Sequence, residues 1–276
     1  SSSNGTLSRK TGQNAMAEKE SYLHRVFALL DCFTAERPEL GVREASRMLG
    51  ISRSATGRLM SELRNEGVLT QDLDTSLYSL GGRVIRWAGV YEAASDLSVK
   101  ALPYIRQLLN KTNETVSLYV VEGNERVCIE RLESRQNVRI VEPIGQRLKL
   151  YAGSGGRAIL AFMPPEEINR ILKLAEQEIT EGDVQEQIRE IREHLEEVRK
   201  TGVAISHGQW VDGASGIAAP IFDESGLPIG SVSVSGPTNR FRDQKTLDAY
   251  RELLLSTMEK LSNEMGYRSD RIIANP

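Results

Sequence analysis

The tightest constraint on the fold is the four-residue corner Leu49-Gly50-Ile51-Ser52, which separates two short amphipathic segments. Before the corner, residues 42–49 carry apolar side chains at helical spacing, and Gly50 interrupts that pattern. After it, Ser52 is suited to cap a third helix that we expect to end near Asn65. Because glycine lets the backbone reverse within so few residues, the corner predicts a helix-turn-helix.

The flanking segments extend this motif into a larger domain. Ser21 predicts the start of a first helix, in which Val26 and Leu29 share an apolar face. Two short strands are predicted near Val68–Gln71 and Leu77–Leu80, with the turn-forming sequence DLDTS between them. We therefore expect a winged helix-turn-helix over residues 21–81.

The predicted third helix begins with residue types that proteins use to bind DNA. Hydroxyls and helix N-terminal amides hold phosphates, and arginine binds the guanine edge through two hydrogen bonds. Arginines one turn apart on the preceding helix are expected to contact the phosphate backbone. The candidate DNA-contacting residues are Arg43, Arg47, Ser52, Arg53, Ser54, Thr56, Gly57 and Arg58. A solvated face of a small helical domain produces the same pattern, so both interpretations stay open at this point.

Composition excludes several other classes of protein. The chain has 276 residues and a formal net charge of -3, so any DNA-binding surface must be a local patch. Its two cysteines, Cys32 and Cys128, lie far apart, and no Cys/His cluster indicates a metal site. No apolar run reaches the length of a membrane span, and the first residues lack a signal-peptide core. We expect a cytoplasmic protein without cofactor, metal or membrane partner, with a disordered tail at residues 1–20 and a second tail at 267–276.

The second half predicts a different kind of domain. Residues 82–96 predict a linker helix, and a further helix is expected over about 99–111, with Pro103 tolerated only near its first turn. The sequences TVSLYVV, RVCIERLE and VRIV look like three successive strands, which favours antiparallel pairing. Further strands are expected near residues 203–206, 216–222 and 229–235, with a helix over 243–265. This mixture predicts an α+β sheet domain over residues 97–266.

The segment YAGSGGRAIL, residues 151–160, permits two functional interpretations. Gly153, Gly155 and Ala158 have the spacing of a dinucleotide-binding turn, which would make the chain an NAD(P)-dependent enzyme. Such a turn directly follows a strand, whereas a long loop separates VRIV from these glycines. No G-x-S-x-G motif or histidine cluster supports hydrolysis either. We therefore predict that the protein is not an enzyme and that the turn lines a small-molecule pocket.

Several residues could form that pocket. Ser154 is expected at a helix N-terminus, where free amides favour an anion, although it could simply cap the helix. Ser233 and Ser235 alternate along a strand, so they face the same side. Trp210 could cover an aromatic ligand, while Arg157 is expected to point outward.

Three stretches of the chain resemble the IclR family of bacterial transcriptional regulators. They are EASRMLGISRSATGRLMSELRNEGVL followed by YSLGGRV, then IGQRLKLYAGSGGRAILAFMPPEE, and SGIAAPIFDESGLPIGSVSVSGP. The resemblance implies a winged helix-turn-helix joined by a linker helix to a GAF-like, antiparallel-sheet effector domain. It also implies homodimers or homotetramers on pseudo-palindromic operator DNA, controlled by a small carboxylate or aromatic metabolite.

The resemblance also implies particular site residues. Ser54, Thr56 and Arg58 fall on the family's recognition-helix positions, where Gly57 departs from the usual bulkier residue. Gly216 is a second departure, because many members place cysteine there, and the change should enlarge the pocket. Together with the tryptophan above, the expected effector contacts are Ser154, Gly155, Ser206, Trp210, Ala214, Gly216, Ser233 and Ser235.

Overall fold

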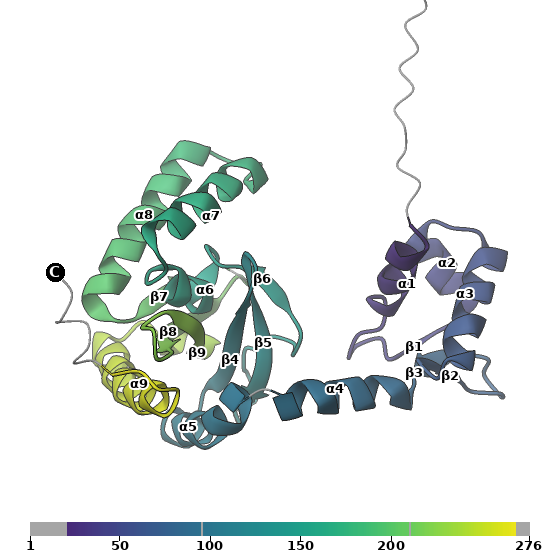
Figure 1. Cartoon of the computed structure of the whole chain (residues 1–276), viewed down its shortest axis with the longest axis horizontal. Helices are drawn as coiled ribbons and strands as arrows, with labels where there is room; N and C mark the ends of the chain where they lie inside the picture. Colours follow the sequence, from purple (N-terminus) through teal and green to yellow (C-terminus); the bar gives the residue numbers. More distant parts are fainter. Residues whose placement is uncertain (1–20, 95, 210, 269–276) are drawn as a thin grey trace, which may run out of the picture. The chain divides into compact units, whose positions relative to one another are not determined.

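The computed structural model describes residues 21–94, 96–209 and 211–268. The chain divides into two compact units, residues 1–93 and 94–276, which are drawn in Figure 1 and described separately below. The expected tail at 1–20 lies outside the described residues, as does all but residues 267 and 268 of the expected tail at 267–276. The functional domain boundaries at residues 81 and 96 stay a prediction.

The first unit contains the expected helix-turn-helix. Helices α1 (Tyr22–Leu30), α2 (Val42–Leu49) and α3 (Arg53–Asn65) are followed by strands β2 (Leu69–Gln71) and β3 (Tyr78–Leu80). At the corner, Gly50 ends α2 with a φ of +65°, and the Ser52 hydroxyl accepts a hydrogen bond from the Ala55 amide at 3.3 Å. A short strand that was not expected, β1 (Glu39–Leu40), pairs antiparallel with β3.

Helix α4 (Gly82–Ala94) occupies most of the predicted linker helix, and α5 (Asp96–Thr112) follows it. The expected position of Pro103 near the first turn is wrong, because α5 begins earlier and Pro103 lies in its interior. Proline there removes one backbone hydrogen-bond donor. Burial of Ala101, Ile105 and Leu108 against the core of the second unit offsets this loss.

The second unit is built on one antiparallel sheet of six strands in the order β6-β5-β4-β9-β8-β7. The strands are β4 (Thr115–Glu122), β5 (Glu125–Leu132), β6 (Arg147–Lys149), β7 (Ala204–His207), β8 (Ala214–Phe222) and β9 (Pro228–Pro237). The predicted α+β class is confirmed, but the strand expected at VRIV is wrong. Residues 138–141 are irregular, and the Val138 carbonyl oxygen accepts a hydrogen bond from Arg240 Nη2 at 2.9 Å, a side chain rather than a neighbouring strand.

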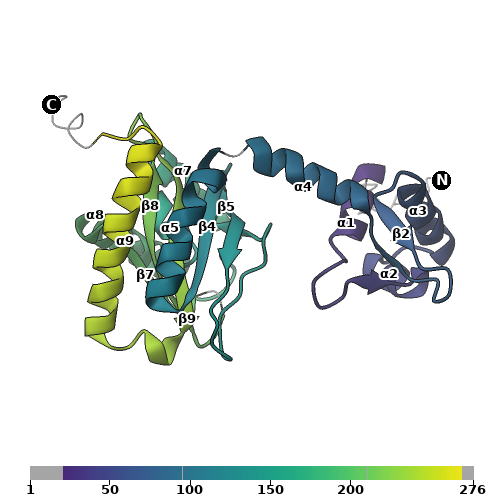
Figure 2. The ribbon, with the colours of Figure 1, turned by 90° about the horizontal axis from the view of Figure 1, so that it is seen from below.

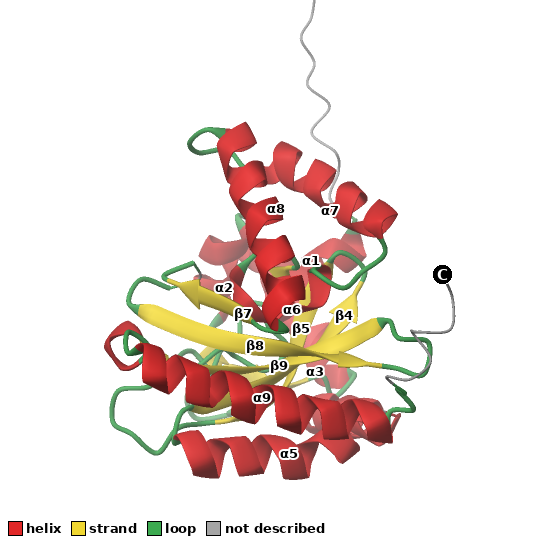
Figure 3. Cartoon of the chain, turned by 90° about the vertical axis from the view of Figure 1, so that its left-hand side faces the viewer, coloured by secondary structure: helices red, strands yellow, loops and turns green. Residues whose placement is uncertain are grey.

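Helices cover both faces of this sheet (Figure 3). Helices α5 and α9 (Gln244–Glu264) lie side by side on one face, as Figure 2 shows from another direction. Helices α6 (Gly153–Leu160), α7 (Pro165–Glu178) and α8 (Val184–Thr201) lie on the other. Side chains alternate along β9, so Val232 and Val234 pack with α5 and α9. Ser231, Ser233 and Ser235 therefore face the α6 layer, where the pocket lies. No described helix is both long and apolar enough to span a bilayer.

Candidate functional site

An unpaired set of basic residues surrounds the start of α3. Arg53 and Arg58 on α3, and Arg43 and Arg47 on α2, are exposed. None of the four forms an ion pair with another residue that the structure describes. Ser52 and Ser54 are also exposed at the N-terminal end of α3, where backbone amides lack helical partners. This surface can hold phosphates and present arginine to base edges, as the sequence predicts.

Thr56 does not belong to this surface, and its prediction as a DNA contact is wrong. Its side chain is 0% exposed, and its hydroxyl donates a hydrogen bond to the Ser52 carbonyl oxygen at 3.1 Å. Thr56 therefore stabilises the first turn of α3 from inside the unit. Gly57 is half-buried, and a Cβ there would lie at an ordinary contact distance of 3.6 Å from Val42 Cγ1.

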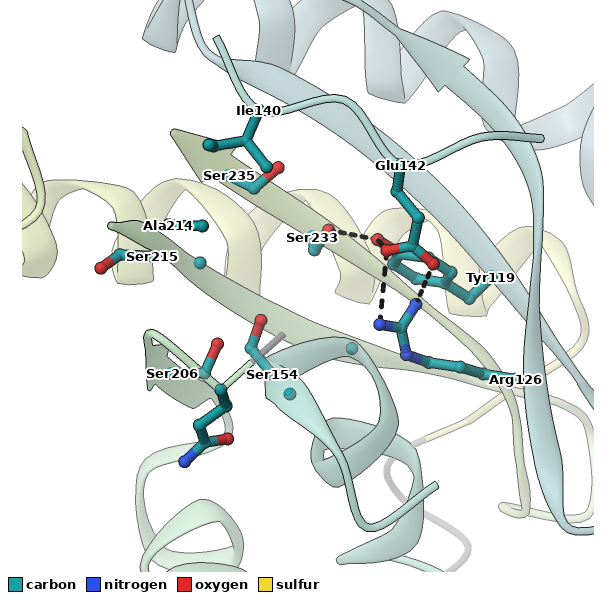
Figure 4. Close-up of a pocket in the computed structure, with 14 residues that line it drawn as sticks. Tyr119, Arg126, Ile140, Glu142, Ser154, Ser206, Ala214, Ser215, Ser233 and Ser235 are labelled. Carbon is teal, nitrogen blue, oxygen red and sulfur yellow. Dashed lines mark hydrogen bonds and ion pairs between the residues drawn. The ribbon is translucent and has the colours of Figure 1, made fainter. Parts of the chain in front are cut away.

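A pocket opens between the sheet of the second unit and the N-terminus of α6 (Figure 4). Its cavity volume is about 40 Å³, so in this structure the pocket is narrow. The structure brings seven of the predicted effector contacts to its walls, while Trp210 lies outside the described residues. The seven are Ser154, Gly155, Ser206, Ala214, Gly216, Ser233 and Ser235. Four elements, α6, β7, β8 and β9, therefore contribute residues to one small space.

The glycine-rich turn shapes the pocket floor. Gly153 has a φ of +66°, a conformation that side chains rarely adopt, and it begins α6. Ala152 is the N-cap residue, so Ser154 does not cap this helix. The Ser231 hydroxyl donates to the Gly155 carbonyl oxygen at 2.8 Å and holds the turn against β9. The first amides of α6 have no partner within the helix, so they are available to a ligand in the pocket.

Gly216 determines how close β8 comes to this turn. A Cβ at residue 216 would lie 2.9 Å from the Ser154 hydroxyl oxygen, which is closer than Cβ atoms approach in real structures. Any side chain here would push Ser154 aside. The geometry supports the expectation that glycine at this position leaves the pocket larger.

The other wall carries a buried charged cluster that the sequence analysis missed. Arg126 donates to Glu142 through Nη1 at 2.9 Å and Nη2 at 3.3 Å, and the two side chains are only 4% and 6% exposed. The Tyr119 hydroxyl contacts Glu142 Oε2 at 3.0 Å and Ser233 Oγ at 3.1 Å. The Arg126 guanidinium lies 4.0 Å from the centre of the Tyr119 ring. One signal for this cluster is visible in the sequence, because Arg126 is a charged residue at the start of the otherwise apolar strand sequence RVCI. Its partner Glu142 could not be identified in this way, since it follows the segment 138–141, which was expected to be a strand.

Burial and charge act in opposite directions within this cluster. Burial strongly raises the pKa of the Tyr119 hydroxyl, so that group stays protonated. Burial alone would lower the pKa of Arg126, but Tyr119 and Glu142 hold it above its ordinary value. The wall therefore contains a fixed ion pair and a neutral phenol.

Arg157 was expected to point outward, but this prediction is wrong. Its Nε donates to the Tyr151 carbonyl oxygen at 2.8 Å, and its Nη1 lies 2.6 Å from His194 Nδ1. Burial lowers its pKa to about 10. Arg157 therefore ties α6 to α8 and does not reach the pocket. Among the described residues, no group of three or more His, Cys, Asp or Glu is placed to hold a metal ion.

Comparisons with known proteins match both units. Residues 23–73 match the family model described as the IclR helix-turn-helix domain, and residues 91–263 match the C-terminal model of the IclR bacterial transcriptional regulators. The transcriptional regulator KipR of Bacillus subtilis is 28% identical over 91% of this chain and 100% of its own length.

Solved structures of IclR proteins share the fold. The IclR protein of Thermotoga maritima aligns with a TM-score of 0.73 at 27% identity, covering 89% of this chain and 98% of its own. A homologue from Microbacterium hydrocarbonoxydans, solved in complex with 4-hydroxybenzoate, aligns with a TM-score of 0.66 at 25% identity. That alignment covers 87% of this chain and 99% of the homologue.

Proposed function

The chain belongs to the IclR family of bacterial transcriptional regulators, and from this premise we propose how its two units act. The first unit binds operator DNA, and the second binds a small organic acid that changes operator affinity. The observation that carries the proposal is the convergence of seven predicted contacts on one pocket at the N-terminus of α6.

The pocket chemistry favours a carboxylate as one end of the effector. The amides of the first turn of α6 and the helix dipole attract an anion. Ser154, Ser206 and Ser235 add hydroxyl donors around the same space. The relative solved with 4-hydroxybenzoate supports an aromatic acid as one candidate class.

The basic surface around α3 is the proposed DNA contact. Ser52, Arg53, Ser54, Gly57 and Arg58 would face the major groove, while Arg43 and Arg47 would hold phosphates. With Thr56 removed from this set, base recognition depends mainly on the two arginines of α3. We propose that the protein acts on DNA in the cytoplasm and has no catalytic activity, in keeping with relatives that are named regulators.

Apolar side chains exposed on the first unit support a homodimer. On α1 they are Tyr22, Leu23 and Phe27, each at least 58% exposed, and on α4 they include Ile85 at 77% and Val90 at 66%. Isolated soluble proteins rarely leave so many large apolar side chains in water. We propose that a second copy covers them, giving a dimer or a pair of dimers on a pseudo-palindromic operator.

Selection of bound duplexes from a random DNA library tests the first half of this proposal. The full-length protein should enrich an inverted repeat, and Arg58→Ala should lose that sequence while keeping its fold. A library that emerges without enrichment would contradict sequence-specific binding. Selection of a single half-site would contradict the dimer alone.

Thermal denaturation of the full-length protein with small carboxylates and aromatic acids tests the second half. A ligand that binds the folded state raises the unfolding temperature of the second unit. The double variant Ser233→Ala, Ser235→Ala should lose this stabilisation but retain DNA binding without ligand. If the double variant responds to the acid as the native protein does, these serines are not part of the site.

A further inference from the structure

A second cavity lies at the β7 edge of the sheet, apart from the effector pocket. Helices α8 and α9 lie on opposite faces of the sheet (Figure 3), and the cavity opens where the end of α8 meets β8 and α9. Its volume is about 400 Å³, against about 40 Å³ for the effector pocket, and the two share none of the described lining residues. A space of this size is typical of small-molecule sites, and the proposed effector does not account for it.

The walls of this cavity are mostly apolar. Phe162 and Phe222 meet edge to face with ring centres 5.3 Å apart, and Tyr267 stacks on Phe222 at 5.2 Å. Ala219 and Met258 also line the cavity and are at most 3% exposed, so it reaches into the core between β8 and α9. Because the aromatic rings already pack on one another, the space left between them and the core suits an aliphatic chain, whose burial removes apolar surface from water.

The open edge of β8 beside this cavity is unsuited to a peptide strand. β7 pairs with β8 only from Ser215 to Ala218, and no described strand continues beside the last residues of β8. Pro220 has no N–H, and the Phe222 amide donates to the Ser262 hydroxyl oxygen at 3.1 Å. An extended peptide would find no free donor at these two positions, which argues against strand addition. The cavity therefore suits a ligand that is held by apolar contact.

Basic residues at the end of α8 give the mouth of the cavity a positive charge. Arg199 and Lys200 line it and are exposed, and neither forms an ion pair within the described part of the chain. Arg199 Nε donates to the Ala161 carbonyl oxygen at 2.6 Å, which holds the guanidinium in place. Glu259 on α9 is the one acidic residue among the described lining residues, so the cations outnumber it. A carboxylate is attracted to this mouth, whereas the apolar interior excludes it, because a buried charge without partners is costly.

We propose that this cavity is a second binding site, for a carboxylate with an unbranched apolar chain, such as a medium-chain fatty acid. The chain lies among Phe162, Phe222 and Met258, and the carboxylate meets Arg199 and Lys200. The site goes beyond the proposed function, since the effector pocket is narrower and lined mainly by serine and glycine residues.

A set of three ligands tests the proposal on the full-length protein by isothermal titration calorimetry. The ligands are hexanoate, octanoate and 1-octanol. Each added CH₂ should tighten binding about fourfold, so octanoate should bind about fifteenfold more tightly than hexanoate. Octanoate should also bind about fivefold more tightly than 1-octanol, which has the same chain length without the charge. Equal affinities for octanoate and 1-octanol would overturn the carboxylate site.

Charge changes at the mouth should act in opposite directions. Lys200→Gln should weaken octanoate binding about threefold, and Glu259→Gln should strengthen it to a similar degree. Neither change should alter the affinity for 1-octanol. Lys260→Gln is the matched control, because Lys260 is also exposed and is adjacent to Glu259 on α9 but does not line the cavity. If all three variants bind octanoate alike, the carboxylate is not held at this mouth and the proposal fails.

The double variant Ser233→Ala, Ser235→Ala separates the second site from the effector pocket. It should bind octanoate as the native protein does, because these serines line only the other cavity. Loss of octanoate binding would place the acid in the effector pocket, which overturns the second site but leaves the proposed function standing. Failure of the native protein to bind octanoate would overturn the site as well. Release of a smaller species by octanoate in sedimentation velocity would assign the cavity to a second copy and likewise contradict the proposal.

Discussion

At the scale of single residues, Gly155 controls the width of the effector pocket. A Cβ at this position would lie 2.9 Å from Tyr119 Cε2 and 3.4 Å from Arg126 Nε. Gly155→Ala should therefore displace the buried cluster and cost roughly 1–3 kcal/mol of stability through overpacking. It should also weaken ligand binding. Urea denaturation and calorimetry measure the two effects.

Gly57→Ala provides the contrasting case for this prediction. It lies inside α3, and its new Cβ would find only an ordinary contact at 3.6 Å. The substitution should raise the stability of the first unit by roughly 0.5–1 kcal/mol, because alanine favours the helix. If Gly155→Ala and Gly57→Ala changed the free energy of unfolding by similar amounts, the space around each Cβ would not be what determines the effect.

Cys128 gives the second unit a dependence on alkaline pH. Its side chain is fully buried, and burial raises the pKa of the thiol from 9.0 to about 12. The folded thiol keeps its proton where the unfolded thiol loses it, so the stabilisation is complete below pH 9. It declines as the pH rises toward 12, by roughly 1.4 kcal/mol for each pH unit.

Comparison of Cys128→Ala with the native protein isolates this effect. The difference in unfolding free energy between them should shrink by about 1.4 kcal/mol from pH 8 to pH 10, as measured by urea denaturation. Titration of other groups is common to both proteins and cancels. A difference that stays constant with pH would show that the buried thiol does not control alkaline stability.

The residues that the sequence could and could not place differ in what determines their position. Ser233 and Ser235 were predictable, because strand alternation fixes the side that each one faces. Thr56 and Arg157 were misplaced because their burial depends on packing between elements. The Arg126–Glu142 pair joins a strand to an irregular segment 16 positions away, and no local period encodes such a contact.

At the scale of elements, most helices and strands follow from the apolar pattern and the capping residues. Ser52 caps α3 as predicted, and the Asp183 side chain caps α8 in the same way. The one strand that was predicted wrongly is a short β-branched segment that forms an irregular part of the chain. VRIV has the composition of a strand, yet it leads into the chain segment that delivers Glu142 to the pocket. Tertiary contacts override local propensity there.

The recognition helix offers a test that separates a surface role from a structural one. Ser54 is exposed at the start of α3, whereas Thr56 is buried and bonded to Ser52. Ser54→Ala should weaken operator binding and leave stability within roughly 0.5 kcal/mol. Thr56→Ala should cost about 1–2 kcal/mol of stability but keep the operator sequence preference. Fluorescence anisotropy and thermal denaturation measure these effects, and a reversed assignment would contradict the proposed DNA-contacting face.

The exposed apolar residues of α4 test the proposed assembly. Ile85→Glu with Val90→Glu would place two charges on the surface that a second copy is proposed to cover. Desolvation of these charges should abolish the dimer, as measured by analytical ultracentrifugation. Leu73→Glu is the matched control, because Leu73 is 88% exposed on the loop between β2 and β3. A dimer that survives the double substitution would have to form through other surfaces.

At the scale of the whole molecule, the two units should be linked through ligand and DNA binding. If the effector changes operator affinity by some factor, the operator must change effector affinity by the same factor. We expect a coupling of roughly 1–3 kcal/mol, or about 5- to 150-fold. Calorimetric titration of the effector with and without operator measures one side, and anisotropy with and without effector measures the other.

Arg58→Ala tests whether the coupling between effector and operator binding passes through the protein or arises from direct contact between the two ligands. The variant should bind the effector as tightly as the native protein without DNA, since Arg58 lies on α3 and the pocket lies wholly within the second unit. Added operator should then leave its effector affinity unchanged, because the operator no longer binds. If operator DNA shifted effector affinity in the variant as well, the coupling would come from direct contact between the two ligands. If the native protein showed no shift in either titration, the effector would not control DNA binding.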